Sequence, residues 1–185
     1  VTGNGWRSDF ALDTIVASEV GPTTPPPLSP AAALTCTFES DFCKWTENGA
    51  GGDKSWTLRS GSTPSSGTGP SGAIEGSQYI YTEASHGNSN KNFILVSPQF
   101  VITTPLKVQF YYHMKGTKMG SLTLSYMDAA GSWNPIVTIS DSQGDDWILG
   151  EVVLPMDATA MQLKGVTGNG WSSDICVDDI KVVDG

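Results

Sequence analysis

The first residues of the chain recur almost unchanged near its end. Residues 1–9 read VTGNGWRSD and residues 166–174 read VTGNGWSSD, and 10 of 15 positions agree when residues 1–15 are compared with residues 166–180. So long a match between distant segments indicates duplication of a whole folding unit. We therefore expect residues 1–15 to be the terminal strand of a preceding repeat, followed by one complete module.

A proline-rich segment separates the first copy of the motif from the rest. Residues 16–33 hold five prolines, which favour an extended polyproline II conformation and a semi-rigid spacer. We predict a linker over residues 16–33 and a single domain over residues 34–185, a length that can bury one ordinary core.

Short runs of strand-forming residues, separated by turn residues, fill this domain. Apolar and polar residues alternate in segments 108–112 and 122–126, which turns one face of each strand toward a core. No stretch longer than a turn or two is typical of a helix, and the regular spacing of turns predicts an all-β sandwich. The predicted strands lie near residues 36–39, 55–59, 78–83, 93–96, 107–114, 121–126, 136–139, 147–154, 160–166 and 175–183.

The charge of the chain narrows the choice of partner. The formal net charge is −9 and there are only 10 Lys and Arg residues in total, which argues against a nucleic-acid partner. No run of about 18 apolar residues occurs, so we expect no membrane insertion within this segment. An acidic surface permits divalent cations or basic partners.

Two of the three cysteines are close in the sequence. Cys36 and Cys43 are seven residues apart, close enough for a turn to bring their sulfur atoms together. A disulfide there constrains the unfolded chain by about 2.5 kcal/mol and implies an oxidising, extracellular compartment. Two reduced thiols in a cytosolic protein are the alternative. Cys176 then either is a buried free thiol or forms a disulfide bond with another chain.

A set of short motifs runs along residues 34–183. The motifs are CTFE at 36–39, FCKW at 42–45, Trp56, GTGPSG at 67–72, YIYTEA at 79–84, LVSP at 95–98, FYYHMKG at 110–116, GSL at 120–122, GDDW at 144–147 and GNGWSSDICVDDI at 168–180. Together they resemble the MAM domain, the extracellular module of meprin, the A5 antigen and a receptor tyrosine phosphatase. Residues 1–15 resemble the terminal strand of the same family.

The resemblance implies both a fold and a kind of work. It implies a jelly-roll-like sandwich of two antiparallel sheets and non-catalytic adhesion, oligomerisation or ligand binding on secreted or membrane-anchored proteins. The family commonly has a fourth cysteine before the Phe110 strand that would pair with Cys176, and this chain lacks it. Ala73 and Ile74 replace an acidic residue and a histidine that are frequent in the family.

Four carboxylates are candidate ligands of a structural calcium ion. Glu39 and Asp41 lie on the predicted first strand and its turn, and Asp178 and Asp179 lie on the predicted last strand. Terminal strands of jelly rolls often lie side by side, and calcium prefers several oxygen ligands. Solvated turn acids, with Asp179 accepting main-chain hydrogen bonds, are the alternative.

Tryptophan side chains suggest a second kind of site, because their faces can stack on sugars. Trp133 tops a predicted hairpin and is the candidate binding residue, although packing at the hairpin tip is the alternative. The other tryptophans of the domain lie in the family motifs, where we interpret them as core or edge packing: Trp45, Trp56, Trp147 and Trp171.

Catalysis has little support in the sequence. The two histidines, His86 and His113, are not in a metal-binding HExxH spacing, and no GxSxG nucleophile motif occurs. We therefore expect no enzyme, and instead a module that binds proteins, homophilically or heterophilically. A carbohydrate- or matrix-binding module, or an accessory domain of an ectoenzyme or receptor, is the alternative.

Overall fold

A computed structural model describes residues 26–47 and 51–185. The predicted strand over residues 1–15 and most of the predicted linker lie outside the described residues. Among the described residues, no helix has the length and hydropathy needed to cross a membrane.

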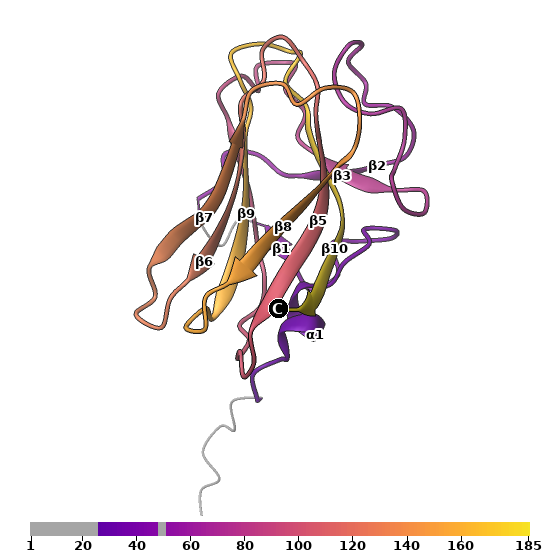
Figure 1. The fold of residues 1–185 in the computed structure, drawn as a ribbon. Coiled ribbons are helices and arrows are strands. Elements are labelled where there is room, and N and C mark those ends of the chain that lie inside the picture. The colour runs from indigo at the N-terminus through magenta and orange to yellow at the C-terminus, as the bar shows by residue number, and fades with distance from the viewer. Residues whose placement is uncertain (1–25, 48–50) are drawn as a thin grey trace, which may run out of the picture.

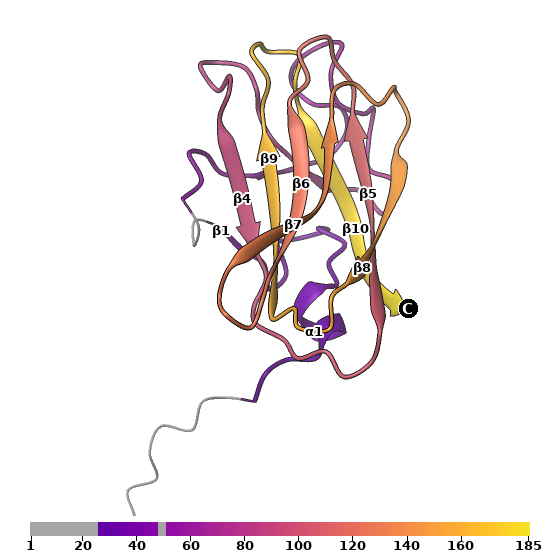
Figure 2. The same cartoon turned by 60° about the vertical axis from the view of Figure 1, so that its left-hand side comes forward.

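Two antiparallel five-stranded sheets stack face to face and form a jelly-roll-like sandwich (Figures 1 and 2). The strand order is β1-β4-β9-β6-β7 in the first sheet and β2-β3-β10-β5-β8 in the second sheet. The strands are β1 (Thr46–Glu47), β2 (Thr57–Arg59), β3 (Tyr79–Tyr81), β4 (Asn92–Val96), β5 (Leu106–Met114), β6 (Ser121–Met127), β7 (Trp133–Ser140), β8 (Ile148–Leu154), β9 (Ala160–Val166) and β10 (Ile175–Asp184). The predicted all-β fold is thereby confirmed.

The core lies between the sheets and follows the predicted alternation. On β5, Val108 and Phe110 are buried whereas Lys107 and Gln109 are half-buried, because successive side chains of a strand point to opposite faces. On β6, Leu122 and Leu124 are likewise buried in the core.

The outer face of the second sheet is covered as well. Every residue of β10 from Ile175 to Ile180 is buried, and Cys176 forms a small cluster with Tyr79 and Tyr81 away from the main core. The long loop between β2 and β3 contacts this face, since the Tyr79 hydroxyl donates a hydrogen bond to the Gly61 carbonyl oxygen at 2.8 Å. The predicted polar loop therefore acts as a cover.

The chain enters the sandwich through a short helix. Helix α1 (Pro30–Leu34) is capped by Ser29, whose side chain accepts a hydrogen bond from the Ala32 amide. Ala33 and Leu34 are buried. Residues 30–33, which belong to the predicted linker, thus pack at the end of the sandwich. Figure 1 shows α1 at the same end as the C-terminus.

The predicted strand over residues 36–39 is not formed. Cys36 makes only an isolated antiparallel bridge to Ile180, and Phe38 has a φ of 57°, a left-handed conformation that interrupts an extended strand. The chain instead turns here, and this turn joins Cys36 to Cys43 in the predicted disulfide, with a Cα–Cα distance of 5.7 Å.

Candidate functional site

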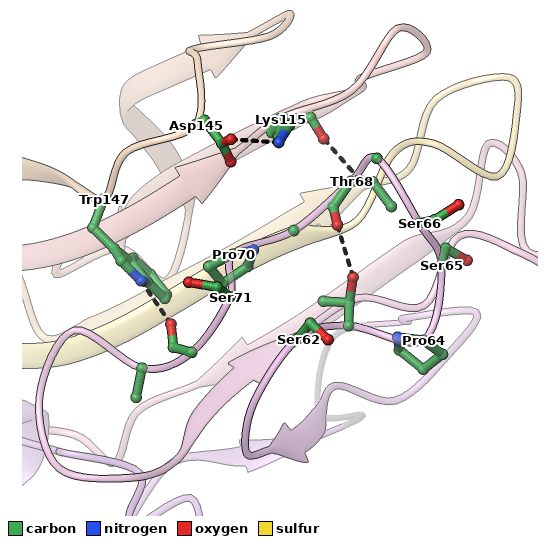
Figure 3. Close-up of a pocket in the computed structure, with 15 residues that line it drawn as sticks. Ser62, Pro64, Ser65, Ser66, Thr68, Pro70, Ser71, Lys115, Asp145 and Trp147 are labelled. Carbon is green, nitrogen blue, oxygen red and sulfur yellow. Dashed lines mark hydrogen bonds and ion pairs between the residues drawn. The ribbon is translucent and has the colours of Figure 1, made fainter.

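A hollow opens at the end of the sandwich remote from α1. Its volume is about 550 Å³, and its walls are the loop over residues 62–73 together with Lys115, Asp145 and Trp147 (Figure 3). Lys115 follows β5 directly, and Asp145 and Trp147 precede β8, so the ends of two paired strands meet the long loop here.

Hydrogen bonds within the loop hold one wall of the hollow. The Thr63 hydroxyl donates to the Thr68 carbonyl oxygen at 3.0 Å, and the Thr68 hydroxyl donates to the Lys115 carbonyl oxygen at 2.8 Å. The Thr68 hydroxyl oxygen also accepts from the Asp174 amide at 3.0 Å. One side chain therefore ties the loop both to the end of β5 and to the segment before β10.

Trp147 forms the opposite wall and is held on several sides. Its indole Nε1 donates to the Gly72 carbonyl oxygen at 2.9 Å, and its ring contacts Tyr79 and His113 edge to face, each with a centroid distance of 5.6 Å. The indole of Trp147 is therefore a packing group, as its place in a family motif predicts.

An ion pair and a buried histidine lie beside the hollow. Lys115 and Asp145 form a solvent-accessible pair, and His113 Nε2 lies 3.6 Å from Asp145 Oδ1. His113 is fully buried, and its two ring nitrogens lack hydrogen-bond partners among the described residues. Burial lowers the pKa of His113, and the neighbouring Asp145 opposes this shift. The imidazole is therefore neutral at pH 7.

The second histidine lies in a hydrogen-bonded chain with Ser85 and Glu83. The Ser85 hydroxyl donates to Glu83 Oε1 at 2.6 Å and lies 2.6 Å from His86 Nδ1. A catalytic serine gives its one proton to the histidine, whereas here Glu83 competes for that proton.

Two of the four predicted calcium ligands accept main-chain hydrogen bonds from the same loop. Glu39 accepts hydrogen bonds from the main-chain amides of Ser77 and Gln78, and these bonds lower the pKa of Glu39. Asp178 Oδ2 accepts from the amides of Ile74 at 3.1 Å and Glu75 at 3.3 Å. The two carboxylates thus anchor the loop over residues 74–78 from both ends.

The other two predicted ligands face elsewhere. Asp41 accepts a hydrogen bond from the Cys43 amide at 2.7 Å, and Asp179 pairs with Lys181 at 2.6 Å. In residues 26–47 and 51–185, no group of three or more His, Cys, Asp or Glu side chains is placed to hold a metal ion. The four carboxylates do not form one ligand set, and calcium binding stays a prediction.

Asp178 nevertheless has an oxygen without a donor. Its Oδ1 atom is buried and has no hydrogen-bond partner among the described residues, and burial raises the pKa of Asp178 to about 6. Asp174, which directly precedes β10, is in a similar state. Its Oδ2 atom is buried without a hydrogen-bond partner among the described residues, and burial raises the pKa of Asp174 to about 6.

The tryptophans differ in exposure. Trp133 lies at the end of the β6–β7 hairpin, where it is the first residue of β7, pairs with Met127 and is half-buried. Its role in binding stays a prediction. Trp171, for which the sequence predicts packing, is 54% exposed. The sequence carries no signal for this exposure, because Trp171 lies in a family motif like the tryptophans that pack.

Comparison with known proteins agrees with this architecture. The profile of the MAM domain, meprin/A5/mu, matches residues 36–185. Neuropilin-1a of Danio rerio is 32% identical over an alignment of 155 positions, which covers 79% of this chain and 16% of that protein. MAM domain-containing protein 2 of Homo sapiens is 28% identical over an alignment of 176 positions, which covers 92% of this chain and 25% of that protein. The chain thus spans a quarter or less of the length of these relatives.

Solved structures share the sandwich at low sequence identity. The K1 cleaved adhesin domain of Lys-gingipain from Porphyromonas gingivalis W83 superposes with a TM-score of 0.61 at 15% identity, covering 83% of this chain and 98% of that domain. TmCBM61 in complex with β-1,4-galactotriose superposes with a TM-score of 0.50 at 17% identity, covering 78% of this chain and 90% of that one.

The fold, the short disulfide-closed turn and the loop-end hollow define a β-sandwich domain of the jelly-roll type. The profile match over most of the chain identifies the family within this class of domain. The chain belongs to the MAM family.

Proposed function

We propose that the chain is a non-catalytic recognition module of a multidomain extracellular protein, secreted or anchored to a membrane. It binds other proteins in adhesion or oligomerisation. Family membership supports this proposal, and so does the Cys36–Cys43 disulfide, because such bonds persist in oxidising compartments.

The observation that carries the proposal is the hollow on a rigid sandwich. Recognition sites are commonly loops positioned by such a scaffold. The hollow has the size of an ordinary ligand site, and its wall presents serine hydroxyls, main-chain groups and one balanced ion pair. This polar lining suits a peptide segment of a partner protein.

The histidine geometry supports a non-catalytic role. His113 is closed off from solvent, and the Ser85 hydroxyl lies within hydrogen-bonding distance of Glu83 as well as His86.

Aggregation of protein-coated beads, with sedimentation velocity in parallel, tests this function. We expect wild-type beads to aggregate and the double variant Lys115→Ala/Asp145→Ala to lose this activity, because its ion pair lines the hollow. The matched control is Lys107→Ala/Glu151→Ala, a 3.2 Å ion pair between β5 and β8 that does not line the hollow. Wild-type beads that stay dispersed, with a monomeric sedimentation profile, contradict homophilic binding. Equal loss in both double variants contradicts the assignment to the hollow.

Carbohydrate binding is the second candidate function. TmCBM61, a structural neighbour, was solved with a galactotriose, although the likeness concerns the fold alone. The observation in this chain that favours a glycan is the exposed indole of Trp171. A role as accessory domain of an ectoenzyme or receptor depends on the neighbouring domains of the parent protein.

A further inference from the structure

Among the described residues, Trp171 is the one aromatic residue with an exposed large apolar side chain. Its exposed fraction is 54%, whereas Trp45 and Trp56 are 5% and 2% exposed. Trp171 lies in the loop between β9 and β10, which belongs to the loop end of the sandwich. An indole in this position offers a large apolar face without covering any part of the core.

The loop that bears Trp171 is firmly held. The Ser173 hydroxyl accepts a hydrogen bond from the Gly168 amide, and the Gly168 carbonyl oxygen accepts one from the Asn90 amide at 2.9 Å. Ser172 and Ser173, which follow the indole, are 4% and 0% exposed. The exposure of Trp171 therefore arises from a fixed backbone, and a fixed aromatic binds at low entropic cost.

Glycine is required in this loop for close packing. A Cβ atom on Gly168 would collide with the Lys118 carbonyl oxygen, and one on Gly170 would lie 3.0 Å from Lys118 Cγ. The Lys118 side chain thus runs over Gly170, next to Trp171. The Lys118 amide also donates to the Ser172 carbonyl oxygen at 3.3 Å. The first carbons of the Lys118 side chain therefore pack against Gly170, the residue that precedes the exposed indole.

A second lysine is attached to the start of the same loop. The Lys91 amide donates to the Thr167 hydroxyl at 2.9 Å, and the Thr167 amide donates to the Lys91 carbonyl oxygen at 3.1 Å. Neither Lys91 nor Lys118 forms an ion pair within the part of the chain that the structure describes, whereas Lys107, Lys115 and Lys181 each do. Two lysines without a salt bridge among the described residues are thus attached to the Trp171 loop, and the charge of Lys91 also acts on Asp53.

We propose that Trp171, Lys118 and Lys91 form a binding site for an acidic glycan, a polysaccharide chain that carries sulfate or carboxylate groups. The proposal rests on the second candidate function above. The indole face packs against the C–H groups of a sugar ring, and the lysines attract its anionic substituents. Charge complementarity favours this occupant over a neutral glycan.

Other surfaces of the sandwich fit such a ligand less well. On the outer face of the first sheet, the hydroxyls of Thr123 and Thr138 bond to each other at 3.0 Å, and no strand of that sheet carries an exposed large apolar side chain. In the hollow, Asp145 already neutralises Lys115. Only the Trp171 loop joins an exposed aromatic face to unpaired cations among the described residues.

The test measures binding of the full chain to immobilised heparin, to hyaluronan and to a neutral galactan over a range of salt concentrations. Heparin separates a sulfate preference from the carboxylate preference that hyaluronan reports. We expect binding to at least one acidic chain that weakens with salt. Trp171→Ala should weaken it about tenfold, which corresponds to about 1.4 kcal/mol, because the stacking of the aromatic ring is lost. Trp171→Tyr should stay near wild type, and Lys118→Ala and Lys91→Ala should each weaken binding and reduce its salt dependence.

The chain provides a matched control for the tryptophan. Trp6 stands in the same VTGNGW motif but outside residues 36–185, the part that matches the family, so Trp6→Ala should bind like wild type. Melting temperatures equal to wild type show that the variants are folded. Absence of binding to both acidic glycans, unchanged binding of Trp171→Ala, or equal binding to the galactan overturns the proposal. Bead aggregation by the hollow is a separate readout, so either proposal can fail without the other.

Discussion

The Thr68 hydroxyl donates a hydrogen bond to the Lys115 carbonyl oxygen at 2.8 Å, although the two residues are 47 positions apart. The same oxygen accepts from the Asp174 amide. Thr68 is 4% exposed, so each of these main-chain groups would be left without a partner if the hydroxyl were removed.

Thr68→Val therefore tests the attachment of the long loop. The change keeps the volume but leaves a buried amide and a buried carbonyl unpaired, and we expect a loss of about 1–3 kcal/mol in the free energy of unfolding. Thr68→Ser keeps the hydroxyl and should lose less. Chemical denaturation measures both values, and a loss in Thr68→Ser as large as that in Thr68→Val would contradict a dominant role of the hydroxyl.

Two neighbouring glycines allow a matched test of the loop backbone. Gly67 and Gly69 have φ values of +76° and +68°, but a Cβ on Gly69 would collide with the Thr63 side chain, whereas one on Gly67 meets nothing within 4 Å. We expect Gly69→Ala to destabilise the domain by about 1–3 kcal/mol more than Gly67→Ala, because only the former adds overpacking to the strain of a positive φ. Equal melting temperatures would contradict the crowding at Gly69.

Buried Asp174 should make stability depend on pH. Its pKa in the folded protein is about 6, above the value of about 4 of an unfolded aspartate, so the fold favours the protonated form. This contribution is fully present below about pH 4 and is lost as the pH rises through about 6. The Asp174→Asn variant carries no such titration. Its free energy of unfolding relative to wild type should rise between pH 4 and 7, by at most about 3 kcal/mol. A difference that stays constant over this range would contradict the raised pKa, and Asp141→Asn is an exposed control.

The calcium prediction has its sharpest test at Asp178. A cation at the unpartnered Oδ1 would offset the cost of a buried charge, so we expect calcium to raise the melting temperature and EDTA to lower it. Saturation at 100 times the dissociation constant would add about 2.7 kcal/mol. Asp178→Asn and Glu39→Gln should abolish the response, whereas Asp41→Asn should keep it, since Asp41 faces Cys43. A melting temperature that EDTA leaves unchanged would refute calcium binding.

The three cysteines should differ in their chemistry. Replacing Cys36 and Cys43 by alanine should cost about 2–3 kcal/mol, because the short closed loop no longer restricts the unfolded chain. Cys176 is fully buried and burial raises its pKa, so its thiol should resist alkylation until the protein unfolds. Chemical denaturation of the double alanine variant checks the first point, and mass spectrometry of alkylated, non-reduced protein checks the second. Rapid labelling of Cys176 in the native state would contradict its burial.

Much of the fold was predictable from local pattern. The alternation around Phe110 and Leu122 correctly indicated which side chains face the core, and the spacing of Cys36 and Cys43 indicated their bond. Both signals operate within a few residues along the chain. The predicted strand at 36–39 was wrong because the positive φ of Phe38 has no signature in the sequence.

The site depended on contacts between distant segments. Trp147 and Trp171 both lie in similar glycine- and aspartate-containing motifs, yet Trp147 packs beneath the Gly72 loop and Trp171 stays exposed. The sequence by itself determined the sheets, the disulfide and the family. Only the tertiary structure decided which indole meets solvent, because exposure depends on which remote loop covers a side chain, and the local pattern carries no information about that cover.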